Sequence, residues 1–461
     1  MGELLIRLEN RLLLQGVPEA LREWLTQTLE FPNPRYLENE RLGRWNRGVP
    51  RRLRFHRRAG ADGMIVPRGF LRQILLACRR LGIPCRLEDR RRSLPPVDFR
   101  FRAELRPFQR VAVARMLERD FGTLSAPAGS GKTVMALAMV AARRQPTLVV
   151  VHTRELAEQW TERIASFLGI PPGACGRIAG GRVRLGEAIT VALVQSLYPR
   201  AAEVAREIGF LIVDECHRCP SRTFTEAVTA FDSRYMLGLS ATPFRRDGLS
   251  RLIFWHLGDR HHEIEERDLR ASGARLPVEV VLRETAFHSF HDPVSEYSRM
   301  LSELTADPER NRLIAADVAA EALAHGGVCL ILSDRRAHCE ALRTLLHYRH
   351  RLASELLTGE MSPEEREGVV ARVNAGGVRV VIATGQLIGE GFDCPALSTL
   401  FLATPVRFSG RLIQYLGRVL RPAPGKEKAR VFDYVDARVE TLLKAALARQ
   451  RLYRRLWPTN P

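Results

Sequence analysis

The sequence predicts an α/β protein: two parallel-sheet units in tandem, preceded by a small basic α+β module. Three observations lead to this prediction. From about residue 100, short continuously apolar segments alternate with helical stretches, as in parallel sheets covered on both faces. A second set of the same kind follows a joint at about residues 271–290. Residues 1–100 hold 21 arginines and no lysine against 11 acidic residues, so +10 of the chain's net charge of +19 lies there.

The 461 residues suggest about three domains at roughly 150 residues each. We expect a basic module over 1–95, a first parallel-sheet unit over 96–275 and a second over 276–461. No apolar run approaches the roughly 18 residues of a membrane span, and the first residues lack the layout of a secretory signal. The eight cysteines form no paired framework, which suits a reducing compartment. The sequence therefore predicts a cytoplasmic protein with no membrane partner, and a monomer is consistent with it.

The basic module begins with a strand-like segment over 5–14, and Pro18 then opens a helix. In residues 51–66, alternating apolar and basic side chains precede a glycine-containing turn, which predicts a hairpin with one cationic face. A helix over about 68–81 and a linker over 90–96 complete the module. The predicted apolar face of the first helix consists of Leu21, Trp24, Leu25 and Leu29.

The arginine excess indicates a polyanionic partner, most simply nucleic acid. An arginine-biased genome would explain the ratio of arginine to lysine, but not its concentration at one end. Two alternatives stay open: a module that docks a protein partner, and one that braces the first parallel-sheet unit. The side chains expected on nucleic acid are Arg54, Arg57, Arg58 and the arginines at 90–92 for phosphates, and Trp45 or Phe55 for bases.

Apolar strands mark both parallel-sheet units. In the second unit we also expect a helix over about 293–324 and another over 436–457. The last helix ends in a cluster of arginines that includes Arg449; a solvated helix face is the favoured interpretation, and a nucleic-acid contact is the alternative. The predicted strands are 121–125, 147–151, 189–194, 210–213 and 236–239 in the first unit, and 328–332, 378–382 and 399–402 in the second.

Residues 126–133 read Ala-Pro-Ala-Gly-Ser-Gly-Lys-Thr and directly follow the apolar run 121–125. A glycine-rich turn between a strand and a helix points several backbone N–H groups into one concavity, which binds phosphate oxygens. Lys132 then reaches the outer phosphates, and the Thr133 hydroxyl holds Mg²⁺. The chain has only three other lysines, so a lysine here reflects a chemical requirement. The sequence predicts a nucleoside triphosphate site formed by Ala128, Gly129, Ser130, Gly131, Lys132 and Thr133.

Two carboxylates, Asp214 and Glu215, stand at the end of the apolar strand 210–213. Open parallel sheets bind ligands beyond the carboxyl ends of their strands, so these acids should face the phosphate loop. We expect Asp214 to hold Mg²⁺ and Glu215 to orient and deprotonate the attacking water. Cysteines at 216 and 219 flank His217 with zinc-like spacing, but no second ligand pair is near, and packing is the favoured interpretation.

Hydroxyl and guanidinium groups complete the predicted site. Ser240 and Thr242 follow another apolar strand, where they could bond to the carboxylates. In the second unit Gln414 begins a predicted helix, and Arg418 and Arg421 share one of its faces. Two guanidiniums aimed at the γ-phosphate would neutralise the charge that develops there, an effect worth about 10³–10⁵ in rate where it has been measured. A solvent-exposed basic helix is the alternative.

Taken in order, these segments resemble the motifs of superfamily 2 helicases over about residues 100–435. In this resemblance Gln109 contacts adenine, 126–133 is motif I, and Arg154 lies in motif Ia on the nucleic-acid side. Asp214 to His217 is motif II of the DExH type. Motif III contains Ser240 and Thr242, motif V contains Asp393, and motif VI contains Gln414, Arg418 and Arg421.

The resemblance implies two RecA-like domains that clamp ATP with Mg²⁺ and move along nucleic acid. His217, Ser240 and Thr242 would couple hydrolysis to movement, and Asp393 would contact the nucleotide. The sequence is most similar to the branch containing the xeroderma pigmentosum group B helicase and UvsW. This implies an ATP-dependent DNA helicase or translocase that remodels duplex or branched DNA in repair or recombination. The alternatives are an RNA helicase or RNA–DNA hybrid remodeller, and a nucleic-acid-binding protein without a productive ATPase.

Overall fold

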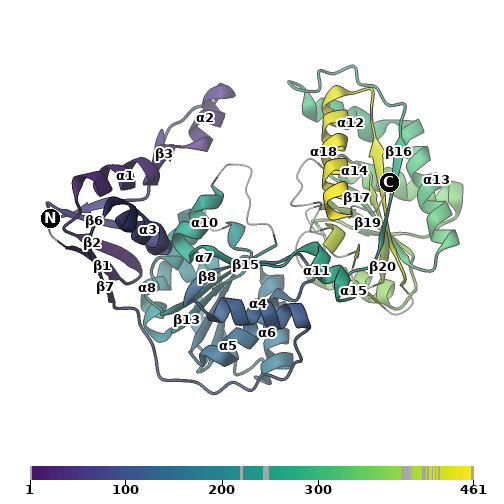
Figure 1. Cartoon of the computed structure of the whole chain (residues 1–461). Coiled ribbons are helices and arrows are strands. Elements are labelled where there is room, and N and C mark those ends of the chain that lie inside the picture. The colour runs from purple at the N-terminus through teal and green to yellow at the C-terminus, as the bar shows by residue number, and fades with distance from the viewer. Residues whose placement is uncertain are drawn as a thin grey trace. The chain divides into compact units, whose positions relative to one another are not determined.

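The computed structural model describes residues 3–218, 222–241, 249–385, 394, 396–406, 412, 415–417, 419–420, 422–423 and 426–457. The chain divides into two compact units: Met1–Ala126 with Gly131–Ile264, and Pro127–Ser130 with Glu265–Pro461. Figure 1 shows the elements of each unit. The predicted domain boundaries near residues 95 and 275 stay predictions.

The first unit begins with the small α+β module. Its described strands run in the order β5-β6-β2-β1-β7, and only β1 and β7 pair in parallel. Two helices, α1 (Glu19–Leu29) and α3 (Leu71–Leu81), share one apolar core with this sheet. Alternate residues of β1 enter that core, which is the pattern of a strand buried on one face. The strands are β1 (Leu4–Leu8), β2 (Arg11–Gln15), β5 (Arg57–Ala59), β6 (Gly63–Pro67) and β7 (Cys85–Asp89).

The predicted hairpin over 51–66 is shorter than expected. Only β5 and β6 form it, because Arg52–Arg54 is a separate strand, β4, that pairs with β3 (Glu30–Pro32) in a second sheet. Between β3 and β4 lies α2 (Pro34–Arg41). Arg57 and Arg58 are consecutive on β5 and therefore point to opposite faces. The prediction of one cationic face was wrong.

The core of the module is completed by α10 (Ser250–Leu257), which comes from much later in the chain. Its Leu252 and Trp255 belong to the same buried cluster as α1, α3 and the sheet. The Trp255 ring lies edge-on to Phe55 and Phe70, at centroid distances of 5.5 and 5.8 Å. Phe55 therefore packs within the protein, and the prediction that it stacks on a base is not supported.

The first parallel-sheet unit confirms the predicted fold class. Its described strands run in the order β11-β10-β12-β9-β13-β14-β8-β15, and all neighbours are parallel except β10 and β11. Strands β9, β12 and β13 are buried at every residue, as continuously apolar strands should be. The strands are β8 (Phe121–Ser125), β9 (Thr147–Val151), β10 (Gly176–Ala179), β11 (Arg182–Arg184), β12 (Ile189–Leu193), β13 (Phe210–Val213), β14 (Tyr235–Ser240) and β15 (Arg260–Glu263).

Helices cover this sheet (Figure 1). Residues of β9, β12 and β13 that face one side form a core with α7, α8, α9 and α10. Helix α5 packs against both α4 and α6, and all three helices contact the sheet. The helices are α4 (Pro107–Leu117), α5 (Lys132–Arg143), α6 (Arg154–Leu168), α7 (Val194–Leu197), α8 (Ala201–Val204) and α9 (Arg222–Val228).

The second unit holds another parallel sheet, so the tandem architecture is confirmed. Its described strands run in the order β16-β21-β20-β17-β19-β18, all parallel. Along β17, Leu330 and Leu332 enter one core, while Cys329 and Ile331 enter another. Both faces of the sheet are therefore buried. The strands are β16 (Val278–Glu284), β17 (Val328–Ser333), β18 (Glu355–Leu357), β19 (Val380–Thr384), β20 (Leu397–Leu402) and β21 (Ala429–Val435).

Three expectations for the second unit need correction. The joint expected at 271–290 contains β16, a half-exposed strand beside β21. The helix expected over 293–324 is broken at Asp307, which caps the second of two helices by accepting from the N–H of Arg310. Arg449 is buried rather than solvated. The helices are α11 (Glu266–Ala271), α12 (Tyr297–Ala306), α13 (Pro308–Ala324), α14 (Arg336–His350), α15 (Pro363–Asn374) and α18 (Glu440–Leu456).

Arg449 fastens α18 to the sheet. Its side chain is 5% exposed and donates two hydrogen bonds, of 2.6 and 2.7 Å, to the buried carboxylate of Asp433 on β21. The Tyr453 hydroxyl donates to the same carboxylate at 2.8 Å. A bidentate pair of this kind fixes orientation as well as distance.

Among the described helices of both units, none has the length and apolarity that crossing a membrane requires.

Candidate active site

The loop between β8 and α5 turns at two glycines with positive φ. Gly129 has a φ of 79° and Gly131 a φ of 83°, values that glycine adopts without the steric penalty of a Cβ. Gly131 is the N-cap of α5, so Lys132 and Thr133 form the first turn of that helix. The free N–H groups and the dipole of a helix N-terminus favour an anion here. Lys132 Nζ folds back to donate to the Ala126 carbonyl at 3.2 Å.

Gln109, the predicted adenine contact, lies against this loop. It is the third residue of α4, and its Oε1 accepts from the Arg106 N–H at 2.9 Å. That bond fixes the amide, whose Nε2 would lie 2.4 Å from a Cβ placed on Gly131. The structure therefore brings Gln109 and the phosphate loop together, and its contact with adenine stays a prediction.

The two predicted carboxylates stand at the same edge of the sheet. Strands β13, β14 and β8 are adjacent and parallel, with Val213 level with Gly238 and Ser240 level with Ser125. Their carboxyl ends therefore meet. The residue that follows Asp214, Glu215, has a φ of 48°, an uncommon conformation for a side chain of this size. Such backbone strain is characteristic of functional sites.

Trp160 on α6 holds Asp214. Its indole Nε1 donates to Asp214 Oδ2 at 2.8 Å, and both side chains are buried. The second oxygen, Oδ1, accepts from the Glu215 N–H at 2.9 Å. Each carboxylate oxygen thus has one fixed donor. The sequence analysis missed Trp160, because it occupies an apolar position on α6 together with Ala157, Ile164 and Leu168.

Lys132 partly offsets the negative charge of the two carboxylates. Burial raises the pKa of Asp214, and the nearby negative charge of Glu215 raises it further, while the Trp160 bond and Lys132 act in the opposite sense. Burial also opposes ionisation of Glu215, but Lys132 and a hydrogen bond from His217 outweigh it and lower its pKa. Glu215 is therefore ionised near neutral pH and able to accept a proton.

His217 joins the carboxylate to the end of β14. Its Nδ1 lies 3.2 Å from Glu215 Oε2 and 3.2 Å from Ser240 Oγ. Two of the three predicted coupling residues are thus in contact with each other and with the predicted base. Thr242, the third, lies outside the described residues. Cys216 is fully buried, and its zinc-like partner at position 219 is also outside them.

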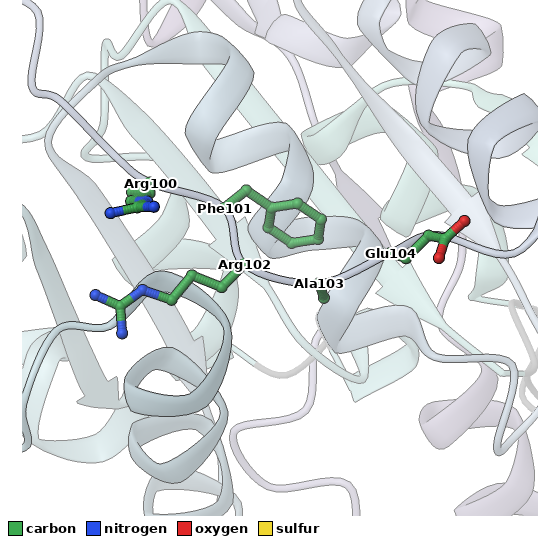
Figure 2. Close-up of a pocket in the computed structure, with 5 residues that line it drawn as sticks. All are labelled: Arg100, Phe101, Arg102, Ala103 and Glu104. Carbon is green, nitrogen blue, oxygen red and sulfur yellow. The ribbon is translucent and has the colours of Figure 1, made fainter.

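An open pocket lies beside the extended chain that leads into α4. It has a volume of about 650 Å³ and is lined by residues 100–104, whose Phe101 and Arg102 side chains leave the backbone in different directions (Figure 2). The Arg102 N–H donates to the Phe167 carbonyl at 2.8 Å, and its guanidinium lies against Gly169 at the C-terminal end of α6. These contacts fix the segment.

Four predicted site residues of the second unit, Asp393, Gln414, Arg418 and Arg421, lie outside the described residues. Their roles stay predictions. The described positions around them pack normally: Leu412, Tyr415, Leu416 and Val419 are buried in the core at helical spacing. The Tyr415 hydroxyl donates to the Gly385 carbonyl, just beyond β19, at 2.7 Å.

The predicted nucleic-acid contacts are exposed to different degrees. Arg57 and Arg58 are exposed, and so is Arg154 at the start of α6. Arg54 is also exposed but pairs with Glu30 at 3.2 Å. In contrast, Arg91 is 6% exposed and bridges Asp89 and Asp120.

Arg92 pairs with Asp232 at 2.8 Å. Arg91 and Arg92 therefore join the basic module to the first parallel-sheet unit, and the prediction that they contact phosphates is not supported. The alternative of a bracing role gains weight from these two residues.

Comparisons with known proteins agree with this geometry. The family described as "Type III restriction enzyme, res subunit" matches residues 102–245, and the "Helicase conserved C-terminal domain" matches residues 310–423. "DNA 3'-5' translocase XPB2" of Sulfurisphaera tokodaii is 30% identical over 361 residues, which cover 71% of this chain and 81% of that protein. The chain belongs to the superfamily 2 helicases.

Other matches agree with this assignment. "Putative ATP-dependent RNA helicase L396" of Acanthamoeba polyphaga mimivirus is 26% identical, over 78% of this chain and 70% of that protein. A putative HsdR subunit of a type I restriction enzyme from Vibrio vulnificus has the same fold, with a TM-score of 0.57 at 19% identity, over 74% of this chain and 66% of that one. The helicase is an ATP-dependent enzyme of the XPB-like kind.

Proposed function

We propose that this helicase is a DNA-dependent ATPase that couples hydrolysis to movement along DNA or to its remodelling, in repair or recombination. The observation that carries the proposal is the convergence of Lys132, Asp214 and Glu215. The Lys132 ammonium acts on the buried carboxylate of Asp214 and on the partly buried carboxylate of Glu215, at the carboxyl edge of a parallel sheet. This arrangement matches what phosphoryl transfer to water needs: a phosphate cradle, a metal ligand and a base.

Hydrolysis follows from these positions. The α5 N-terminus and Lys132 would bind the outer phosphates, and Gln109 would contact the adenine edge. Ionised Glu215 orients a water and accepts its proton as the oxygen attacks the γ-phosphorus. Lys132 offsets negative charge on the phosphates. The increase in the rate of hydrolysis therefore comes from positioning and electrostatics rather than from a covalent intermediate. His217, whose Nδ1 lies 3.2 Å from both Glu215 Oε2 and Ser240 Oγ, would respond to this protonation of Glu215.

Mg²⁺ fits the donor set. Asp214 presents a carboxylate with one fixed donor on each oxygen, and Thr133 presents a hydroxyl in the first turn of α5. Carboxylate and hydroxyl oxygens are the ligands that Mg²⁺ prefers. When bound, the ion would neutralise charge on the phosphates and order their oxygens.

Lys132→Ala and Glu215→Gln test the chemistry. We expect each to abolish nucleic-acid-stimulated ATP turnover, because the first removes the phosphate contact and the second the proton acceptor. Lys444→Ala is the matched control, since Lys444 is an exposed lysine paired with Glu440 on α18. Wild-type turnover by either site variant would overturn the proposal. Arg418→Ala and Arg421→Ala extend the test to the predicted arginines.

The substrate is tested by comparing polynucleotides. ATP turnover is measured with single-stranded DNA, duplex DNA, branched DNA and RNA at one stated salt concentration, because phosphate contacts make affinity steeply salt-dependent. We expect DNA to stimulate most. A relative named as an RNA helicase keeps RNA as the second candidate. Stronger stimulation by RNA would favour that candidate, and no stimulation by any polynucleotide would reject both.

A further inference from the structure

Residues 30–54, here called the arm, form a projection of the basic module. Its base is the short antiparallel pair β3 and β4, and α2 lies beyond that base (Figure 1). Phe31 of β3 is 6% exposed and stacks on Phe55, with centroids 5.9 Å apart. The base of the arm is therefore anchored in the core.

Hydrogen bonds within the arm hold its shape. The Asn33 side chain accepts from the Arg35 N–H and donates to the Pro50 carbonyl, so the start of α2 is tied to the returning chain. Asn39 Nδ2 donates to Asn46 Oδ1 at 3.0 Å, and Asn46 Nδ2 donates to the carbonyl of Tyr36. Asn46 thus fastens the loop after α2 to two residues of that helix. Such a preorganised surface loses little conformational entropy on binding.

The far end of the arm exposes a large aromatic ring. Trp45 is 86% exposed; Leu37 on α2 and Leu42 just after that helix are 49% and 46% exposed. The other four tryptophans are buried or partly buried. An aromatic side chain of this size usually buries 150–250 Å² of surface, and this burial contributes on the order of several kcal/mol. An indole left this exposed therefore points to a partner.

The charge of the arm indicates what that partner is. Between residues 30 and 54 there are seven arginines and three glutamates, a net charge of +4. Glu30 is already taken up by Arg52 and Arg54 at the base. The remaining arginines are exposed and make no ion pair within the part of the chain that the structure describes: Arg35, Arg41, Arg44, Arg47 and Arg51.

We propose that the arm binds nucleic acid at a position where bases are unpaired, with Trp45 stacked on a base and Arg44 and Arg47 on the flanking phosphates. This inference rests on the proposed function and assigns one contact of the substrate. A paired duplex offers its base faces only at its ends, whereas a single strand or a fork offers them freely. Arginines on either side of an aromatic ring match that pattern, because the ring stacks on a base and the guanidiniums bind the flanking phosphates.

The test uses the full chain and two labelled DNAs of equal length, a fork with single-stranded tails and a blunt duplex. We expect Trp45→Ala to weaken binding to the fork by roughly 5- to 150-fold, the range for loss of one stacked base, and to change duplex binding less than twofold. Trp45→Phe keeps a stacking ring and should retain most of the affinity. Phe290→Ala, at an aromatic residue that is 88% exposed in the second unit, is the control.

A second measurement addresses the phosphates. Arg44→Ala with Arg47→Ala should weaken binding to the fork and lower the magnitude of its log–log salt slope by roughly 0.7 for each phosphate that is no longer neutralised. Arg299→Ala, at an exposed arginine paired with Glu296, should leave the slope unchanged. Quenching of tryptophan emission by the fork should be reduced in the Trp45→Phe protein.

The proposal would be overturned by wild-type fork affinity in Trp45→Ala, by equal losses on fork and duplex, or by binding of the arm to anionic vesicles in preference to the fork. Basal ATP turnover should be normal in every arm variant, which shows that each is folded. If wild-type protein itself shows no DNA-stimulated turnover, the proposed function fails, and that result is distinct from failure of the arm.

Discussion

Replacing Trp160 by phenylalanine isolates one hydrogen bond of the active site. The aromatic ring is kept, and the indole N–H that donates to Asp214 Oδ2 at 2.8 Å is removed. Because Trp160 and Asp214 are 2% and 7% exposed, water is poorly placed to take over that bond. We therefore expect Asp214 to rotate away from the orientation in which it would hold Mg²⁺.

The size of the effect follows from the kind of bond. A hydrogen bond to a charged group contributes about 1.5–3 kcal/mol, and an unsatisfied buried acceptor costs a similar amount. At about 1.4 kcal/mol for each factor of ten, this corresponds to roughly 10- to 100-fold. In other proteins, mutating a group that orients a metal ligand lowers metal affinity or activity by about the same factor. The Mg²⁺ concentration that half-activates ATP turnover should rise by this factor.

The assay is ATP turnover against Mg²⁺ concentration at saturating ATP and DNA. Trp457→Phe is the matched control, because Trp457 is 3% exposed and stacks on Tyr453, far along the chain from the site. It removes the same volume without touching a catalytic group. Equal Mg²⁺ dependence in wild type and Trp160→Phe would refute the positioning role, and so would an equal shift in both variants.

Three further predictions concern stability and the phosphate loop. Burial lowers the pKa of His256 from 6.5 to about 4. Because the unfolded chain binds the proton more tightly, the free energy of unfolding should fall by up to about 3 kcal/mol as pH falls from 6.5 to 4. Urea unfolding of His256→Phe should lack this part of the pH dependence. Arg449→Met leaves the buried Asp433 carboxylate without its cation and should destabilise the protein by about 3–5 kcal/mol; Arg449→Met with Asp433→Asn should recover most of it, as a double-mutant cycle in chemical denaturation would show. Gly131→Ala should abolish ATP binding in a calorimetric titration, because φ is +83° and the new Cβ would approach Gln109 Nε2; normal affinity would contradict the account of the loop.

Most strands buried on both faces were predictable from sequence, whereas β21 and the strands at sheet edges were not. The expected segments 147–151 and 210–213 coincide with β9 and β13, because nearly every residue in them is apolar and all are buried. β16 has a half-exposed, mixed pattern and resembles a loop. β21 is buried but carries Asp433, whose partner Arg449 lies 16 residues away on α18. A sequence pattern does not show that such a distant cation makes a charged strand possible.

The arrangement of the site was largely predictable, since the residues proposed to bind phosphate and activate water follow strands at fixed spacing. Lys132, Gln109 and Glu215 all occupy the predicted edge. Trp160 was missed because burial at helical spacing looks the same for a packing residue and for a hydrogen-bond donor. The tryptophan on an otherwise aliphatic face of α6 was the available signal, since only its side chain there can donate.

The contribution of α10 to the hydrophobic core of the basic module has a practical consequence. Truncation before the first parallel-sheet unit would expose Leu252 and Trp255 to water. The isolated basic module would in turn lack these two side chains of its hydrophobic core. Neither half is then a fair stand-in for the intact chain. Removing only the tip beyond β3 and β4 would instead leave this core whole, but it would also remove the proposed contact of Trp45 with a base.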